Sequence, residues 1–252
     1  MAHTDISWRS VRHAEGFYTS EVHSPAAQPI RTFLPTGYEP RYAYPLLVFF
    51  HGHGGSEEQI LRLAPRLSRR NYICISLRGP QALGARADGR IGYSWGPDGQ
   101  LDAQVEDYVI EAVRQTRRNY HVHSERIYLA GFHEGATLAY RLGLTFPEKI
   151  AGIISLNGAM PRQGGPLMRL PAVRQLRVLI GHGIANAVVP LSMAQQDYRL
   201  LYAAGIDVNI QTYPATHKLH PDMLKDIDRW VMSAIQDSIP AESTEEPEES
   251  EN

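Results

Sequence analysis

The chain has little of what marks several classes of protein. Its 252 residues include a single cysteine, so no disulfide can form within the chain, which fits a reducing compartment. No apolar run is long enough to span a membrane, and the first sixteen residues lack the apolar core of a signal peptide. We therefore expect a cytoplasmic protein without a transmembrane segment. Cys74 itself lies in the β-branched run NYICIS, which predicts a buried small hydrophobe rather than a reactive thiol.

Basic residues are too few and too scattered for a nucleic-acid surface. The chain has 25 Lys and Arg against 27 Asp and Glu, and seven of the acidic residues fall within residues 237–252. The rest therefore carries 25 basic against 20 acidic residues (27 minus 7), with no basic cluster among aromatics. We expect no nucleic-acid partner. Residues 237–252 have too few apolar side chains to offset the entropy of ordering, which predicts an acidic disordered tail.

What the chain does have is a regular alternation of short apolar runs and longer helical patterns over one predicted domain, residues 1–236. Strands that are apolar throughout and alternate with helices indicate an α/β fold with a mainly parallel, doubly wound sheet. Before residue 40 the pattern suggests an antiparallel pair at one edge of that sheet. The predicted strands are 44–50, 72–77, 126–132, 150–158, 176–183 and 207–214, and the predicted helices are 56–71, 100–120, 134–148, 191–205 and 220–236.

The most informative segment is RIYLAGFHEGATLAY, residues 126–140, which predicts a strand, a tight turn and a helix. Many hydrolases mount their nucleophile on such a turn, with the pattern Gly-x-Ser-x-Gly. Here the turn is Gly131-Phe132-His133-Glu134-Gly135, so histidine stands at the serine position. The loop 79–99 is too long for a plain connection and is expected to form part of a site.

Four segments resemble the carboxylesterase/phospholipase branch of the α/β-hydrolase superfamily, a group of small lidless acyl-ester hydrolases. They are FFHGHGGSEEQ, LAGFHEGATLAYRL, LIGHGIANAVVPLSMAQ and YPATHKLHPDML, and the likeness extends over about residues 44–235. The resemblance implies an α/β-hydrolase fold with a catalytic nucleophile, acid and base in that chain order. It also implies an oxyanion hole made of backbone N–H groups.

The resemblance assigns the oxyanion donors to the backbone N–H groups of His53 and Glu134. Gly52 and Gly54 in HGHGG would permit the close backbone approach that such a hole requires. Trp95 falls where the family lines its acyl pocket, although packing within the loop is an equally good interpretation.

The same resemblance places the base at His217, with His220 as the weaker candidate. Asn186 stands where the family has its aspartate, and an amide has no charge with which to stabilise an imidazolium. An Asp-to-Asn change at this point costs about four orders of magnitude in turnover in a serine protease. Two of the three triad positions, His133 and Asn186, therefore depart from the family pattern.

These departures favour a catalytically impaired family member, a pseudoenzyme or ligand-binding protein that takes a small ester-like or acyl ligand. The alternatives are an active ester hydrolase with His133 as nucleophile, or a metal held by histidines such as His53, His133 and His217. The side chain of Glu134 is expected to point away from the pocket and leave His133 without an activating partner. We expect no cofactor, and either a monomer or a homodimer.

Overall fold

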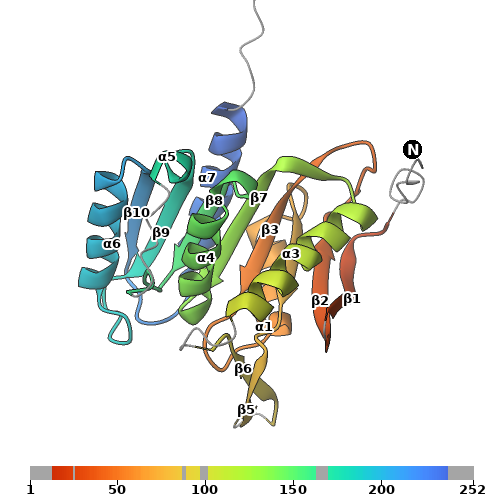
Figure 1. Cartoon of the computed structure of the whole chain (residues 1–252), viewed down its shortest axis with the longest axis horizontal. Coiled ribbons are helices and arrows are strands. Elements are labelled where there is room, and N and C mark those ends of the chain that lie inside the picture. The colour runs from red at the N-terminus through yellow and green to blue at the C-terminus, as the bar shows by residue number, and fades with distance from the viewer. Residues whose placement is uncertain (1–12, 25, 87–88, 97–101, 163–169, 238–252) are drawn as a thin grey trace, which may run out of the picture.

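The computed structural model describes residues 13–24, 26–86, 89–96, 102–162 and 170–237. Within these residues an eight-stranded sheet has the order β1-β2-β4-β3-β7-β8-β9-β10 (Figure 1). The strands are β1 (Gly16–Ser24), β2 (Ala26–Leu34), β3 (Tyr44–Phe50), β4 (Ile73–Leu77), β7 (Val122–Phe132), β8 (Gly152–Leu156), β9 (Arg177–Gly183) and β10 (Asp207–Tyr213).

The direction of the strands confirms the predicted class. β1 pairs with β2 and β2 with β4 in antiparallel fashion, and every other neighbouring pair in this sheet is parallel. The antiparallel edge is therefore the N-terminal part of the chain, as its alternating pattern predicted. The central strands β3, β4 and β8 are buried along their whole length, because helices cover both faces.

Two groups of helices enclose the sheet. The helices α3 (Asp102–Asn119), α4 (Glu134–Thr145) and α6 (Leu191–Ala203) pack on one face. The helices α1 (Glu57–Leu61), α2 (Ala64–Leu67) and α7 (Pro221–Asp237) pack on the other. Two short elements complete the list, η2 (Pro147–Lys149) and α5 (Leu170–Val173).

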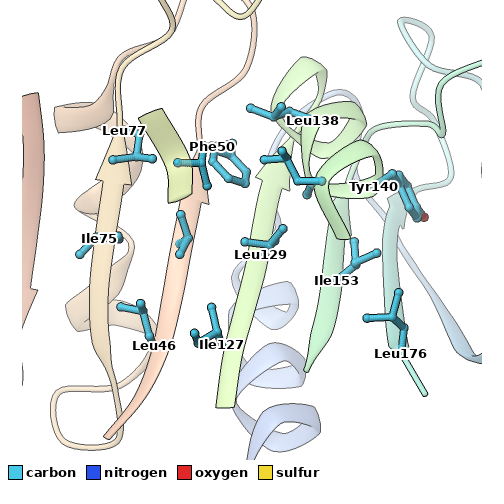
Figure 2. Close-up of a cluster of buried hydrophobic side chains, with 14 of the residues drawn as sticks. Leu46, Phe50, Ile75, Leu77, Ile127, Leu129, Leu138, Tyr140, Ile153 and Leu176 are labelled. Carbon is cyan, nitrogen blue, oxygen red and sulfur yellow. The ribbon is translucent and has the colours of Figure 1, made fainter. Parts of the chain in front are cut away.

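Each face has its own apolar core. Figure 2 shows part of the core under α3 and α4, where Leu46, Ile75 and Leu129 project from adjacent parallel strands. All three are fully buried, and such burial stabilises the fold by about 1.5–3 kcal/mol for each large aliphatic side chain. The opposite core includes Trp230 of α7 and Tyr128 of β7, whose rings meet edge to face at 6.0 Å.

The structure corrects the prediction of one continuous helix over residues 56–71. Ser56 is the predicted N-cap and its hydroxyl accepts a hydrogen bond from the Gln59 N–H at 3.3 Å. The helix nevertheless ends after Leu61, and a separate helical turn, α2, begins at Ala64. The cause is Pro65, which has no N–H to donate and whose ring clashes with the preceding turn of a continuing helix.

The long segment 79–99 also contains structure that the sequence did not predict, an antiparallel hairpin of β5 (Gln81–Ala85) and β6 (Ile91–Ser94). A bridge between Gly55 and Tyr93 joins this hairpin to the loop that follows β3. At the other end of the chain α7 includes Asp237, and the remainder of the predicted acidic tail lies outside the described residues. None of the described helices combines the length and the apolar character needed to cross a membrane.

We predict that Gly135→Ala strongly destabilises the protein. A Cβ atom at residue 135 would lie 2.2 Å from the Phe50 carbonyl oxygen and 2.6 Å from that of His51, and both obstacles are backbone. We expect the free energy of unfolding to fall by about 2 kcal/mol or more, measured by urea denaturation. Gly143→Ala is the comparison variant: its Cβ would lie 2.6 Å from Cδ1 and Cγ1 of the Ile153 side chain rather than against backbone, and alanine favours the helix, so we expect a smaller loss. Equal losses in the two variants would contradict this account.

Candidate active site at the carboxyl ends of the strands

The turn between β7 and α4 holds His133 in an unusual backbone conformation. Its φ of 53° and ψ of −115° lie in a region that residues other than glycine rarely adopt. The flanking glycines make this turn possible. A Cβ at residue 131 would lie 2.0 Å from the carbonyl oxygen of Gly135, and one at residue 158 would lie 2.7 Å from that of His133. The sharp turn therefore raises the His133 side chain at the carboxyl end of the central strand.

His217 lies directly against His133. The two ring centroids are 4.6 Å apart and the rings are nearly perpendicular, at 87°. The ring of Phe132 flanks His217 at 5.0 Å. His220, the weaker candidate, instead stacks on Tyr213 at 5.9 Å. The structure thus places His217 beside the turn and His220 at the start of α7.

Asn186 orients His217 through its amide oxygen. This Oδ1 accepts the backbone N–H groups of Val188 at 3.1 Å and Val189 at 3.0 Å, so it must be the oxygen rather than the nitrogen of the amide. The same Oδ1 lies 3.1 Å from Nδ1 of His217, which must then carry the proton. Nε2 of His217 is left as a hydrogen-bond acceptor. An aspartate would select the same tautomer, so the amide changes the charge and not the tautomer.

Behind this pair lies Asn157, which the sequence analysis missed. It is buried, with a φ of 51°. Its Oδ1 accepts the N–H of Gly183 at 2.8 Å, and its Nδ2 donates to the carbonyl of Lys218 at 2.9 Å. Asn157 therefore ties the loop that bears Asn186 to the loop that bears His217. The Asn-Gly pair at the end of the predicted strand 150–158, in the segment SLNG, was the available signal.

Burial keeps both imidazoles of the pair uncharged. It lowers the pKa of His133, against the smaller opposing effect of the Glu134 carboxylate. Burial, together with the neighbouring His133 and His182, lowers the pKa of His217 to about 4. No carboxylate among the described residues reverses the lowering of the His217 pKa, because the neighbouring side chain at residue 186 is an amide.

The predicted oxyanion donors lie on two loops that meet at this turn. The N–H groups of His53 and Glu134 have no hydrogen-bond acceptor among the described residues. Gly52 permits the close approach of the loop, since a Cβ there would lie 2.8 Å from the Phe132 ring. Gly54 serves a different purpose, because its φ is 70° and nothing lies within 4 Å of its Cβ position. Its N–H donates to the Tyr93 carbonyl at 2.9 Å and so attaches the hairpin.

His51 braces this loop from beneath. It is buried, its Nε2 accepts the N–H of Gly79 at 2.9 Å, and its Nδ1 lies 2.8 Å from the Gly52 carbonyl. The first contact requires a bare Nε2, so Nδ1 carries the proton and donates. Burial lowers the pKa of His51, in agreement with this neutral state.

The side chain of Glu134 does not point away from the site as expected. Its Oε1 accepts from the Ser94 hydroxyl at 2.6 Å and from the Trp95 N–H at 3.2 Å. Its Oε2 is buried and lies 3.4 Å from Nδ1 of His53. The first turn of α4 is therefore fastened to the β6 strand and to the oxyanion loop, which sequence spacing alone could not reveal.

Trp95 packs beneath the oxyanion loop rather than facing an open pocket. It is 2% exposed, and its indole N–H donates to the His51 carbonyl at 2.9 Å. Its ring meets that of Phe50 edge to face at 5.4 Å. Of the two interpretations of Trp95, the burial of its ring and the bonded indole N–H favour packing within the loop.

The histidines do not form a metal site in the part of the chain that the structure describes. Among those residues, no three His, Cys, Asp or Glu side chains are grouped so that they could hold a metal ion. Of the three proposed ligands, His53 is directed to Glu134, and the Nδ1 of His217 is directed to Asn186. Around the imidazole of His133, the site instead has a neutral His217 and the backbone N–H groups of His53 and Glu134.

Comparison with known proteins identifies the family. The profile of the Phospholipase/Carboxylesterase family matches residues 39–235. An acyl-protein thioesterase 1 of Gibberella zeae is 25% identical over 151 residues, which cover 54% of this chain and 64% of that protein. An acyl-protein thioesterase 1 of Mycosarcoma maydis is 30% identical over 118 residues, which cover 44% of this chain and 49% of that protein. The chain thus matches about half to two-thirds of the length of these relatives.

Solved structures agree on the fold. The carboxylesterase of Mesorhizobium loti superposes with a TM-score of 0.68 at 20% identity, over 85% of this chain and 98% of that one. The Bacillus cereus carboxylesterase gives a TM-score of 0.65 at 18% identity, over 82% and 94%. The sheet order, the sharp turn at His133 and the family profile lead to one conclusion: this chain belongs to the phospholipase/carboxylesterase family of α/β-hydrolases.

Proposed function

We propose that this protein is a pseudoenzyme of its family, impaired as a serine hydrolase, that binds a small ester-like or acyl ligand beside His133. The observation that carries the proposal is the pairing of His133 with His217 across 4.6 Å at the sharp turn. In a serine hydrolase this position holds a hydroxyl that attacks the acyl carbon after the base has taken its proton. Here an imidazole occupies the position, and no hydroxyl stands at residue 133.

The surroundings of Asn186 support an amide rather than a carboxylate. Its Nδ2 donates to Oδ1 of Asn157 at 3.3 Å. The Asn157 amide cannot turn to offer a donor, because its two ends are bound to Gly183 and Lys218. A carboxylate at residue 186 would set two acceptor oxygens against each other in a buried place, which is unfavourable. This contact supports the proposal of a neutral residue at the position of the acid.

The retained features support ligand binding. The N–H groups of His53 and Glu134 are free to bind a carbonyl or carboxylate oxygen, and Gly52 keeps their loops close. The bare Nε2 of His217 can accept a hydrogen bond from a ligand. Together these groups suit the polar end of an ester-like or acyl ligand.

One observation favours a second candidate function, hydrolysis of carboxylic esters with His133 as nucleophile. Burial lowers the pKa of His133, which keeps its imidazole in the neutral, nucleophilic form. The bare Nε2 of His217 is next to it and could accept the proton that His133 loses. This candidate requires His133 for turnover, whereas the leading proposal does not.

Turnover of a short-chain activated aryl ester separates the two candidates. We expect the wild type and His133→Ala to be equally slow. The double variant His133→Ser/Asn186→Asp should be faster by about 100-fold or more, because serine hydrolysis depends on both residues by several orders of magnitude. A fluorophosphonate probe should label the double variant and not the wild type. Robust wild-type turnover that His133→Ala abolishes would overturn the leading proposal in favour of the second.

We predict that Asn186→Asp raises the pKa of His217 from about 4 toward or above its ordinary value of 6.5. The new carboxylate would stand where Oδ1 lies 3.1 Å from Nδ1 of His217 and would favour the charged imidazole. The measurement is an NMR titration of the His217 ring. Asn186→Ala is the control, since it removes the hydrogen bond without adding a charge, and an equal rise in that variant would contradict the electrostatic explanation.

The free energy of unfolding should also depend on pH through the protonation of His217. The pKa of His217 is about 4 in the folded protein and near its ordinary 6.5 in the unfolded chain. The unfolded chain therefore binds more protons between these values, and the wild type loses stability as the pH falls from 6.5 toward 4. In Asn186→Asp the loss of stability that His217 causes on acidification should shrink or change sign. The measurement is the difference in melting temperature between pH 7 and pH 5. If the melting temperature differed by the same amount between the two pH values in the wild type and in Asn186→Asp, His217 would not be the source of the pH dependence.

A further inference from the structure

A cavity lies at the other end of the sheet from His133. It has a volume of about 1170 Å³ and is enclosed by α3, α4, η2 and the amino-terminal half of β7. Figure 1 shows α3 and α4 on the same face of the sheet with β7 between them. β7 begins at Val122, eleven residues before His133, which corresponds to about 35 Å along an extended strand. This groove is therefore separate from the site already described.

The floor of the groove is apolar. It is made by Val113 of α3, Ile127 and Leu129 of β7, Leu142 of α4, and Phe146 and Ile150 around η2. Val113, Phe146 and Ile150 are only partly buried and so remain open to an occupant. A concave apolar surface of this size suits the hydrocarbon part of a ligand.

The rim of the groove is cationic. Four basic side chains lie on it: Arg114, Arg117, Arg118 and Lys149. Glu148 also lines it, and Glu111 pairs with both Arg114 and Arg118, so the local balance is four cations against two carboxylates, or +2. Arg117 and Lys149 are exposed and form no ion pair with any described residue. Lys149 lies over the Phe146 ring at 5.0 Å, which places a positive charge at the edge of the apolar floor.

The occupant must complement both the floor and the rim. Residues 1–12 include the apolar Ile6, Trp8 and Val11, but also Arg9 and Arg12, whose charge would oppose the cationic rim. Residues 238–252 have the right charge, with six glutamates, but little beyond Ile239 to cover an apolar floor. Neither segment of the chain fits both parts of the groove.

We propose that this groove binds a free single-chain amphiphile with an anionic head. Its alkyl chain lies on Val113, Phe146 and Ile150, and its carboxylate or phosphate is bound by Arg117 and Lys149. The head gains charge-assisted hydrogen bonds, and the chain buries apolar surface that is now exposed to water. This proposal is independent of the one for the His133 site, because it uses none of the same residues.

Calorimetric titration of the full chain with ten-carbon amphiphiles below their micelle concentration tests the charge requirement. We expect decanoate and decyl phosphate to bind and decyltrimethylammonium not to bind. In Arg117→Glu/Lys149→Glu the affinity for decanoate should fall by about tenfold or more. The matched control is Arg62→Glu/Arg199→Glu, which changes the net charge equally at exposed positions away from the groove and should leave the affinity unchanged. Equal binding of the cationic amphiphile, or equal weakening by both double variants, would overturn the proposal.

A decanoate carrying a terminal diazirine tests the location. After irradiation and peptide mapping we expect adducts within residues 109–129 or 142–150. Adducts confined to the neighbourhood of Phe132 and His217 would overturn the proposal. The proposal would also be overturned if the protein sedimented with anionic phosphatidylglycerol vesicles but did not bind free decanoate. The partner of the groove would then be a membrane surface.

One further variant tests whether the acidic tail, rather than an amphiphile, occupies the groove. The six glutamates between residues 242 and 251 are changed to glutamine in the full chain, which removes the charge that would compete for the rim. The proposal expects the affinity for decanoate to change by less than about twofold. A rise of about tenfold or more would show that the tail already occupies the groove and would overturn the proposal.

Discussion

The close packing of backbone against backbone around His133 is the constraint on which the rest of the site depends. A Cβ on Gly131 would overlap with the carbonyl oxygen of Gly135, and a Cβ on Gly135 would overlap with that of Phe50. This contact forces His133 into its left-handed conformation, which costs about 1–3 kcal/mol and must be offset by the packing around it. The turn fixes the direction of the imidazole, the start of α4 and the position of the Glu134 N–H. Replacing the side chain at residue 133 leaves this framework unchanged.

The framework explains why the shape of the site does not depend on which side chain stands at residue 133 or 186. The proposed oxyanion donors, the N–H groups of His53 and Glu134, are backbone groups positioned by glycine contacts and by the buried His51, so they do not depend on the side chain at residue 133 or 186. The tautomer of His217 depends only on an acceptor oxygen at residue 186, which asparagine supplies. What asparagine does not supply is charge, and the lowered pKa of His217 follows from that. The shape of the site and the protonation of His217 are thus controlled by different residues.

Electrostatic contacts also divide the molecule into two ends. At the carboxyl ends of the strands, Glu134 joins α4 to the hairpin and to His53, so one carboxylate holds three segments together. At the amino-terminal end of β7, two arginines share Glu111 while Arg117 and Lys149 have no carboxylate partner among the described residues. The carboxylate at the first end is bonded within the protein, whereas the second end has two exposed cations.

The sequence by itself determined the sheet, most helix positions and the identity of the residues at the turn, because these depend on local periodicity, glycine spacing and chain order. It correctly placed the antiparallel edge, the N-cap at Ser56 and the end of α6 near Gly205. Only the tertiary structure decided that Trp95 is buried, that Glu134 turns toward His53, and that Asn157 joins the two loops behind His217. The physical reason is that each of these facts is a contact between segments far apart in the chain. Such contacts arise from how the layers pack, and a local pattern such as the Asn-Gly pair can mark a residue without identifying its partners.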